Sequence, residues 1–159
     1  MLRGLSALFG LLALGACEAA VNSTSALPAE ASTGAVPLAV NPEESHMWMT
    51  VGDRRFAITL SDNAAARAFA AQFPLTLDLS DLNGNEKHAK LPRALPTDAS
   101  RPGTIRNGDL MLYGADTLVV FYLTFNSTYS YTRLGRVNDP DDLATVVGRG
   151  NVRVELSEK

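Results

Sequence analysis

The chain has 159 residues, of which 46% are hydrophobic and 19% charged, and its formal net charge at pH 7 is −3. This length and composition are typical of one globular domain with a hydrophobic core, and they exclude a largely disordered chain. The acidic balance, with no cluster of lysines and arginines, excludes a nucleic-acid binder with a basic surface, and the single cysteine excludes an intramolecular disulfide.

The first 17 residues predict an export signal. Arg3 precedes a short apolar run over residues 5–14, a pattern that is typical of a secretory signal peptide. The run is too short to span a hydrocarbon core of about 30 Å. It ends in Leu14-Gly15-Ala16-Cys17, which resembles the lipobox of bacterial lipoprotein precursors. That resemblance implies cleavage after residue 16 and attachment of lipid to Cys17. The alternative is ordinary cleavage near Ala16 or Ala20, which leaves a free thiol.

The residues around this cysteine also predict where the protein resides. Lipid on Cys17 holds a periplasm-facing domain on a membrane of the cell envelope. Glu18 stands where an Asp is associated with retention in the inner membrane of enteric bacteria, which favours the outer membrane. Residues 18–45 are rich in Ala, Ser, Thr and Pro without periodicity, which predicts a flexible tether. We therefore expect a signal peptide over residues 1–16, a lipidated Cys17 with its tether over residues 17–45, and a folded domain over residues 46–159.

The folded domain is expected to open with a hairpin. Residues 47–51 lead through Gly52-Asp53 into residues 54–60, where apolar and polar side chains alternate as in a half-buried strand. An Ala-rich helix is expected next over residues 63–73, with Ser61 or Asp62 as its N-cap and Pro74 as its end. Its buried stripe is expected to consist of the apolar residues that recur every four positions: Ala65, Phe69 and Phe73.

The rest of the domain is expected to contain more short strands, one long loop and a second helix. The expected strands are residues 75–80, 108–113, 117–123 and 152–156. Residues 118–123 are apolar throughout, which predicts burial on both sides of the strand. Residues 83–107 are polar and contain several prolines, which predicts a long loop, and residues 139–147 predict a short helix. Many short strands with two helices predict a mainly β fold with a closed antiparallel barrel.

Several motifs occur in a fixed order after residue 92: Leu95-Pro96-Thr97-Asp98, Gly103-Thr104-Ile105, GDLMLYG over residues 108–114, the apolar residues 118–122, and STYSYTRLGRV over residues 127–137. In this order and spacing they resemble the bacterial cyclophilin-like domain family, and the resemblance extends over residues 47–157. It implies a closed eight-stranded antiparallel cyclophilin-like barrel with two short helices. It implies no established activity, because these small proteins stand apart from the true prolyl isomerases.

True cyclophilins place a Phe-His-Arg signature on an early strand, and a catalytic arginine hydrogen-bonds to the twisted peptide bond of the substrate. In this chain neither His46 nor His88 has a Phe and an Arg beside it. The isomerase signature is therefore not found. The arginines that remain as candidates for the guanidinium are Arg54, Arg55 and Arg133.

The segment from Tyr129 to Arg133 is the strongest candidate for a binding site. Alternation along a strand aims Tyr129, Tyr131 and Arg133 to one face. Two aromatic rings beside a guanidinium are suited to a peptide or an anionic ligand. The alternative is that the tyrosines fill the barrel while Arg133 pairs with a surface carboxylate. Tyr113 and Phe121, on the neighbouring strands, are the further candidate ligand-binding residues.

Other candidate sites are weaker. Asp98, Arg101 and Arg106 in the long loop are a candidate polar rim, with a solvated loop as the alternative. His46 and His88 have no His, Cys or carboxylate at metal-ligand spacing, so we expect no metal site. We expect no cofactor, because the sequence contains no phosphate-binding glycine loop and no nucleophile motif.

Our leading hypothesis is a membrane-anchored, non-enzymatic cyclophilin-like domain that binds a peptide or a small ligand in the cell envelope. The second hypothesis is a divergent peptidyl-prolyl cis-trans isomerase that acts on periplasmic proteins. The third is a structural envelope protein whose barrel contacts a partner. Nucleic acid is not expected among the partners.

Overall fold

The structure is a computed structural model that describes residues 47–158. The expected signal peptide over residues 1–16, the lipidation site Cys17, the tether up to residue 45 and His46 lie outside the described residues. Between residues 47 and 158, every helix falls short of the length and hydropathy that a membrane span requires.

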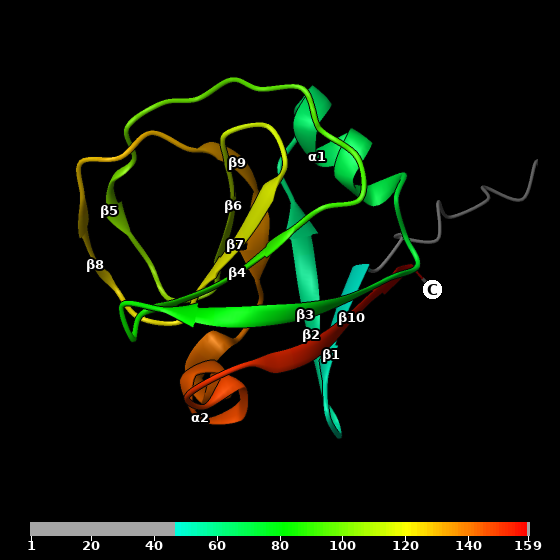
Figure 1. Cartoon of the computed structure of the whole chain (residues 1–159), viewed down its shortest axis with the longest axis vertical. Coiled ribbons are helices and arrows are strands. Elements are labelled where there is room, and N and C mark those ends of the chain that lie inside the picture. Colours follow the sequence, from blue (N-terminus) through cyan, green and yellow to red (C-terminus); the bar gives the residue numbers. More distant parts are fainter. Residues whose placement is uncertain (1–46, 159) are drawn as a thin grey trace, which may run out of the picture. The chain divides into compact units, whose positions relative to one another are not determined.

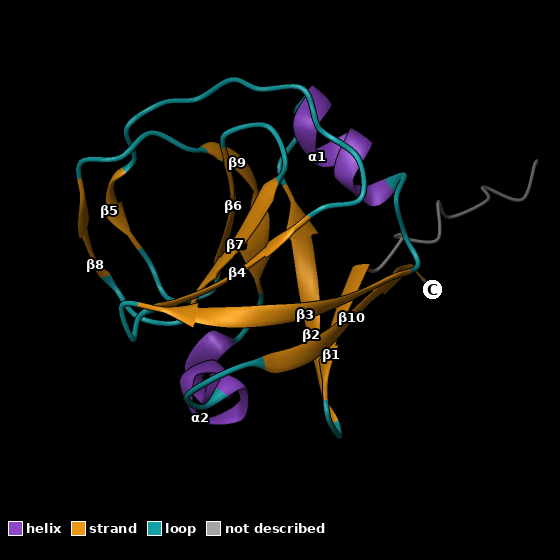
Figure 2. Cartoon of the chain, viewed as in Figure 1, coloured by secondary structure: helices purple, strands orange, loops and turns teal. Residues whose placement is uncertain are grey.

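Eight antiparallel strands form a closed barrel (Figure 1). Around the barrel the strands follow the order β1 (Met47–Val51), β10 (Val152–Glu158), β3 (Leu75–Leu82), β4 (Glu86–Lys90), β7 (Thr117–Phe121), β6 (Asp109–Tyr113), β9 (Thr132–Val137) and β2 (Arg54–Leu60). Two further strands, β5 (Gly103–Ile105) and β8 (Phe125–Ser127), pair with each other outside the barrel. Together with the short helices α1 (Ala64–Ala70) and α2 (Leu143–Val147), this confirms the predicted mainly β fold with an eight-stranded barrel (Figure 2).

The predicted hairpin at the start of the domain is confirmed. β1 and β2 pair antiparallel, with Met49 opposite Phe56. Gly52 in the turn between them has a φ of 56°, a left-handed conformation that glycine adopts without steric cost.

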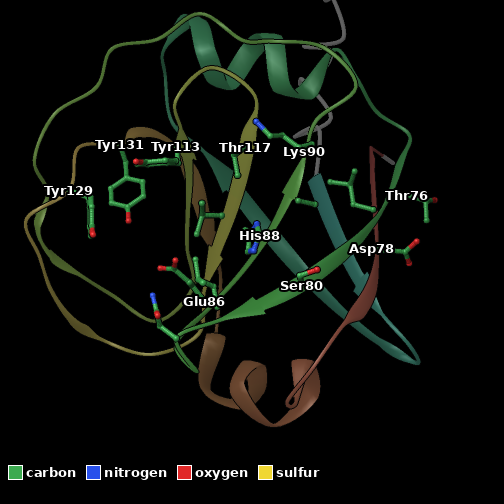
Figure 3. A pocket seen from close by; sticks show the side chains of 15 residues that line it. Thr76, Asp78, Ser80, Glu86, His88, Lys90, Tyr113, Thr117, Tyr129 and Tyr131 are labelled. Atoms are coloured by element: carbon green, nitrogen blue, oxygen red, sulfur yellow. The ribbon is translucent and has the colours of Figure 1, made fainter.

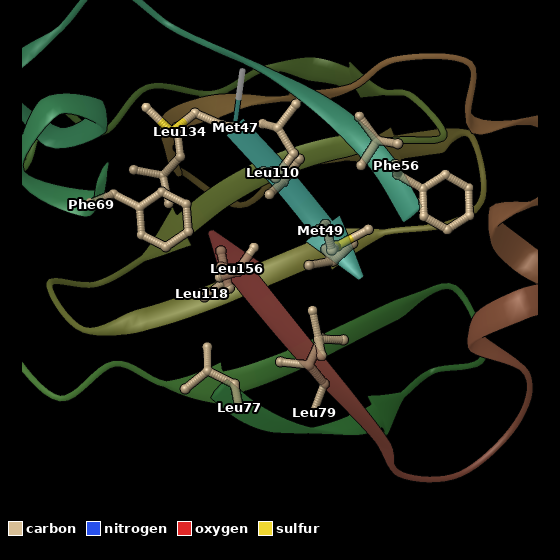
Figure 4. Packing of buried hydrophobic residues seen from close by; sticks show 14 of the residues in the cluster. Met47, Met49, Phe56, Phe69, Leu77, Leu79, Leu110, Leu118, Leu134 and Leu156 are labelled. Atoms are coloured by element: carbon tan, nitrogen blue, oxygen red, sulfur yellow. The ribbon is translucent and has the colours of Figure 1, made fainter. Parts of the chain in front are cut away.

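Inward-facing side chains of the strands fill the barrel (Figure 4). Met49, Leu79, Leu110 and Leu118 are fully buried there, each at 0% exposure. Burying one side chain of this size stabilises the fold by about 1.5–3 kcal/mol. Side chains therefore occupy the interior of this small barrel.

Helix α1 begins one residue later than the predicted helix over residues 63–73. Its N-cap is Asn63, and the expected caps Ser61 and Asp62 lie before it. The Oδ1 atom of Asn63 accepts a hydrogen bond from the backbone N–H of Ala66 at 2.8 Å. This bond satisfies one of the free N–H groups of the first turn, which is the reason that Asn63 marks the start of the helix.

The same helix ends at Ala70, three residues before the predicted end. The backbone N–H groups of Gln72 and Phe73 donate to carbonyls only three residues earlier, so the chain tightens into a 3₁₀-like turn before Pro74. The predicted stripe is nevertheless confirmed, because Ala65 and Phe69 are buried and the Phe73 ring meets the Phe69 ring edge-on at 5.0 Å.

The predicted helix over residues 139–147 consists of a 3₁₀ turn, η1 (Pro140–Asp142), followed by α2. Leu143 and Val147 of α2 are buried in the main core. Figure 2 shows α1 and α2 beyond opposite ends of the barrel. Each helix thus shields from water the apolar side chains at one open end of the barrel.

Strand β7 is buried on both sides, as its apolar run predicts. Leu118 and Val120 face the main core, whereas Val119 and Phe121 face a second hydrophobic cluster outside the barrel. The other buried members of this cluster are Ile105, Met111 and Tyr131. The prediction was wrong at Leu123, which is 46% exposed, because the chain leaves the barrel after Phe121.

Strand β4 lies where the sequence predicts only a loop, within residues 83–107. It pairs with β3 on one side and with β7 on the other, and β5 also lies in this range. The prediction of an unbroken loop was wrong because the inward side chains of β4 are Lys87 and Ala89. Neither is a large apolar residue, so the strand lacks the alternation that marks a half-buried strand.

Candidate functional site

A groove of about 710 Å³ lies on the outer face of the barrel (Figure 3). Its floor includes outward side chains of β4 and β7, namely Glu86, His88, Thr117 and Val119. One wall is polar and belongs to β3, with Thr76, Asp78 and Ser80. The opposite wall is aromatic and consists of Tyr113, Tyr129 and Tyr131.

The aromatic wall brings together two distant parts of the chain. Tyr113 ends β6, whereas Tyr129 and Tyr131 lie between β8 and β9. The ring centroids of Tyr113 and Tyr129 are 6.4 Å apart with planes at 86°, and those of Tyr113 and Tyr131 are 5.8 Å apart at 55°. Tyr113 is 49% exposed and Tyr129 63% exposed, so much of each ring is open to solvent.

Tyr131 anchors this wall to the barrel. Its backbone N–H donates to the Ser100 carbonyl at 2.9 Å, and the Ser100 N–H donates back to the Tyr131 carbonyl at 3.0 Å. The Tyr131 ring is 7% exposed and meets the buried Phe121 ring edge-on at 5.5 Å. A packed and hydrogen-bonded base of this kind holds the more exposed rings in a defined place.

The groove is lined by three of the five residues predicted to bind a ligand: Tyr113, Tyr129 and Tyr131. Phe121 lies under the wall at 0% exposure and does not line the groove. Arg133 does not line it either, because its Nη1 atom lies 3.2 Å from Oδ1 of Asp109. Asp109 is only 2% exposed, so Arg133 neutralises a carboxylate that is buried.

The predicted clasp of two tyrosines and one guanidinium is therefore not formed. The strand that carries Arg133 begins at Thr132, and Tyr131 before it forms an isolated bridge with Ser100. The alternative arrangement also differs from the structure. Tyr131 packs outside the barrel, and the carboxylate that meets Arg133 is a buried one.

The other two arginines considered for an isomerase site are also engaged elsewhere. The Nη2 atom of Arg54 lies 2.7 Å from Oδ2 of Asp142. The guanidinium of Arg55 lies 4.1 Å from the centroid of the Trp48 ring. Neither arginine lines the groove.

The charged residues of the long loop do not form a rim of the groove. Asp98, Arg101 and Arg106 are exposed and lie outside it. The backbone N–H of Asp98 donates to Oγ1 of Thr132 at 2.9 Å, which ties the loop to β9. Across residues 47–158, no three or more His, Cys, Asp or Glu side chains are placed together so as to hold a metal ion.

Comparison with known proteins assigns the fold to a family. Residues 49–157 match the family model described as the cyclophilin-like family. The chain belongs to the cyclophilin-like family. This confirms the resemblance that the motifs after residue 92 predict. No match was found among curated proteins or among solved structures.

Two residues of the groove in this cyclophilin-like domain were missed by the sequence analysis. Glu86 and His88 lie on β4 and point outward into the groove, as Figure 3 shows. A usable signal exists in Asn83-Gly84, since both residues have positive φ and this pair commonly joins two hairpin strands. A hairpin there places residues 86, 88 and 90 on one face of the strand after the turn.

Most charges around the cyclophilin-like groove are already paired. The Nζ atom of Lys90 lies 2.5 Å from Oδ1 of Asp116. Asp78 accepts two hydrogen bonds from Arg153, at 2.9 and 3.1 Å. Glu86 differs, because among residues 47–158 no hydrogen bond or ion pair engages its carboxylate, although the residue is only 7% exposed.

Burial changes the acid–base behaviour of this groove. It raises the pKa of the Glu86 carboxyl above its ordinary value, because water cannot solvate the charged form fully. Burial also raises the pKa of the Tyr131 hydroxyl, and the negative charge of Glu86 raises it further. The floor of the groove and the aromatic wall are thus electrostatically coupled through Glu86 and Tyr131.

Proposed function

We propose that this cyclophilin-like protein is a binding module held on a membrane of the cell envelope through lipid on Cys17, and that its groove takes a peptide segment or a small ligand. The observation that carries the proposal is the aromatic wall. Tyr113 and Tyr129 expose 49% and 63% of their surfaces beside a groove of about 710 Å³.

The composition of the groove supports binding. Ligand sites are commonly concave and combine apolar or aromatic surface with a few polar groups that fix orientation. Tyrosine contributes a large rigid ring at low entropic cost and a hydroxyl that can hydrogen-bond. Here the rings lie opposite polar side chains of β3, including Thr76 and Ser80. The filled barrel leaves this outer surface as the place for a ligand.

A titration followed by NMR tests the binding proposal. The isotopically labelled protein, produced from the full chain and held in detergent micelles, is titrated with a peptide panel. The peptide panel consists of blocked pentapeptides of alanine that carry Lys, Arg, norleucine, Glu or Pro at the centre. We expect saturable shifts of the Tyr113, Tyr129 and Tyr131 signals with at least one member.

Two variants identify the groove as the site of that binding. Tyr129→Ala is expected to weaken binding several-fold, because it removes the most exposed ring of the wall. Leu123→Ala is the matched control, since Leu123 is a large exposed apolar residue outside the groove. Equal effects of both variants, or shifts confined to other surfaces, contradict the proposal.

The isomerase hypothesis predicts a different result with the proline peptide. None of the candidate arginines, Arg54, Arg55 and Arg133, lines the groove, which disfavours a guanidinium at the proline peptide bond. A protease-coupled assay of proline isomerisation is therefore expected to show no acceleration. An acceleration of proline isomerisation that disappears with Arg55→Ala or Arg133→Ala would overturn the hypothesis of a non-enzymatic binding module.

The membrane anchor is tested separately by cell fractionation. Cys17→Ser is expected to release the protein from membranes or to leave an unprocessed precursor, because the sulfur that carries the lipid is absent. The matched control is Ser23→Ala, a similar small substitution in the expected tether. A Cys17→Ser variant that remains membrane-bound and normally processed rules out the anchor.

A further inference from the structure

Glu86 is an unusual residue in the floor of the groove. It is 93% buried, yet no cation or hydrogen-bond donor among residues 47–158 meets its carboxylate. The side chain lines the groove, so its carboxylate is partly desolvated and faces a space that a partner from outside the chain can enter. An external cation there would compensate the charge that the protein itself leaves unpaired.

The surroundings of Glu86 select the charge of that partner. The other charged groups that line the groove, Asp78 and Lys90, are neutralised by Arg153 and Asp116. The remaining titratable side chains are His88 and the three tyrosines of the wall. The uncompensated charge of the groove is therefore negative and belongs to Glu86, which disfavours an anion and favours a cation.

The aromatic wall lies in the same groove as Glu86. In Figure 3 the Glu86 carboxylate lies below the rings of Tyr129 and Tyr131, on the same side of the groove. Glu86 and Tyr131 both line the groove. Tyr113 stands at 55° to one of these rings and at 86° to the other, so the three rings partly enclose a space. Ring faces attract alkylammonium and guanidinium groups.

We propose that the groove binds the cationic group of its ligand, an alkylammonium or a guanidinium, between the Glu86 carboxylate and the wall of Tyr113, Tyr129 and Tyr131. This inference rests on the proposed binding function and names the chemical class of the ligand. The ammonium or guanidinium belongs either to a Lys or Arg side chain of a peptide or to a free amine. The carboxylate supplies the charge-assisted hydrogen bond, and the rings contact the alkyl stem and the charge.

The peptide panel tests this specificity directly. Lysine and norleucine have side chains of similar apolar length, but only lysine carries a charge. We expect the Lys and Arg peptides to bind about tenfold more tightly than the norleucine peptide, and the Glu peptide to bind most weakly. n-Hexylamine distinguishes the two sources: binding as tight as that of the Lys peptide assigns a free amine, and much weaker binding assigns a peptide.

Matched carboxylate variants locate the cation. Glu86→Gln keeps the size of the side chain and removes its charge, so the tenfold preference for lysine over norleucine should disappear. Asp142→Asn, at a carboxylate outside the groove that is paired with Arg54, should leave the preference unchanged. Tyr129→Leu keeps apolar surface but removes the ring face, so it should weaken lysine binding more than norleucine binding.

The possible failures are distinguishable. Equal binding of the Lys, norleucine and Glu peptides in the groove overturns the cation site and leaves the proposed binding function standing. A preference for lysine that survives Glu86→Gln overturns the role of Glu86. The absence of any shift at the three tyrosines, with every peptide and with n-hexylamine, overturns both proposals. If Glu86→Gln fails to fold, the lysine-to-norleucine ratio of the unmodified protein decides.

Discussion

The guanidinium of Arg133 lies 3.2 Å from the carboxylate of Asp109, a residue that is only 2% exposed. The other oxygen of Asp109 accepts a hydrogen bond from the backbone N–H of Arg106 at 2.9 Å. Asp109 therefore joins the start of β6 to the preceding turn and to β9. Arg133 stabilises this junction, which explains why an exposed arginine near two tyrosines does not contribute to the groove.

This pair predicts that Arg133 matters for stability and not for binding. Arg133→Ala should lower the free energy of unfolding by about 1 kcal/mol, and Asp109→Ala by about 2–3 kcal/mol because the partly buried hydrogen bond from the backbone N–H of Arg106 is lost as well. Chemical denaturation measures both values, and the peptide titration should be unchanged by Arg133→Ala. Loss of binding with full stability would instead give Arg133 a direct role in the site.

Glu86→Gln should make the domain more stable at neutral pH. The pKa of Glu86 is raised by burial, so the folded state binds its proton more tightly than the unfolded state does. Stability is therefore lost as pH rises from the ordinary value of 4.5 through the raised pKa, and the Gln variant avoids this loss.

Denaturation from pH 3 to pH 8 measures this effect. The advantage of the Gln variant should be small in acid and should grow as pH rises. Tyr122, Tyr131 and His88 face the same region, so the comparison is always made with the unmodified protein at the same pH. If the unmodified protein is instead more stable than the Gln variant at neutral pH, Glu86 has an internal partner in solution.

A second hydrogen-bond network, at the end of β4, should stabilise the fold only within a limited range of pH. The Tyr122 hydroxyl donates to Oδ1 of Asp81 at 2.7 Å, and the fully buried Lys87 lies 2.9 Å from the same oxygen. The hydrogen bond from Tyr122, followed by that from Lys87, lowers the pKa of Asp81 below its ordinary value of 3.8. Burial, followed by the hydrogen bond to Asp81, raises the pKa of Tyr122 from 10.0 to about 12.

These two shifts have opposite consequences with pH. The contribution of Asp81 is present above 3.8 and is lost as pH falls through its lowered pKa. The contribution of Tyr122 is present below 10 and is lost as pH rises toward about 12. Tyr122→Phe should therefore lower the free energy of unfolding by about 1–2 kcal/mol between these limits, and by less outside them. A difference that is constant from pH 3 to pH 11 contradicts this account.

Gly135 should tolerate no side chain. A Cβ atom at this position of β9 meets the backbone oxygen of Thr59 at 2.5 Å and the Cα of Leu60 at 3.0 Å, on the neighbouring strand β2. Backbone atoms of a paired strand cannot move cheaply, so Gly135→Ala should cost about 3 kcal/mol of unfolding free energy. The control is Gly114→Ala, where no atom lies within 4 Å and only the φ of 62° is strained, at a cost of about 1 kcal/mol. Equal losses in thermal denaturation would contradict the packing argument.

The strands that the sequence analysis found bury an apolar face, whereas β9 was missed although it too buries Leu134 and Val137. β1, β2, β6 and β7 carry apolar side chains toward the core, and their alternation or continuous apolar character is visible in the sequence. β4 was not predicted because Lys87 occupies an inward position at the end of the barrel. There the ammonium of Lys87 pairs with Asp81 and donates a hydrogen bond to the Gly150 carbonyl. The alternating pattern indicates a strand only where apolar side chains are buried. It gives no signal where a polar side chain is buried with its partners.

The sequence alone determined the family, the barrel and most of its strands, and it singled out the three tyrosines that line the groove, because each depends on local patterns and on motifs in a fixed order. Only the tertiary structure decided which of those residues meet. Barrel closure brings Tyr113 of β6, Tyr129 of a distant loop and Glu86 of an unpredicted strand to one groove, and it pairs Arg133 with Asp109 outside that groove. Such neighbours depend on strand register and on burial across long separations in the chain, and no local pattern of side chains records either.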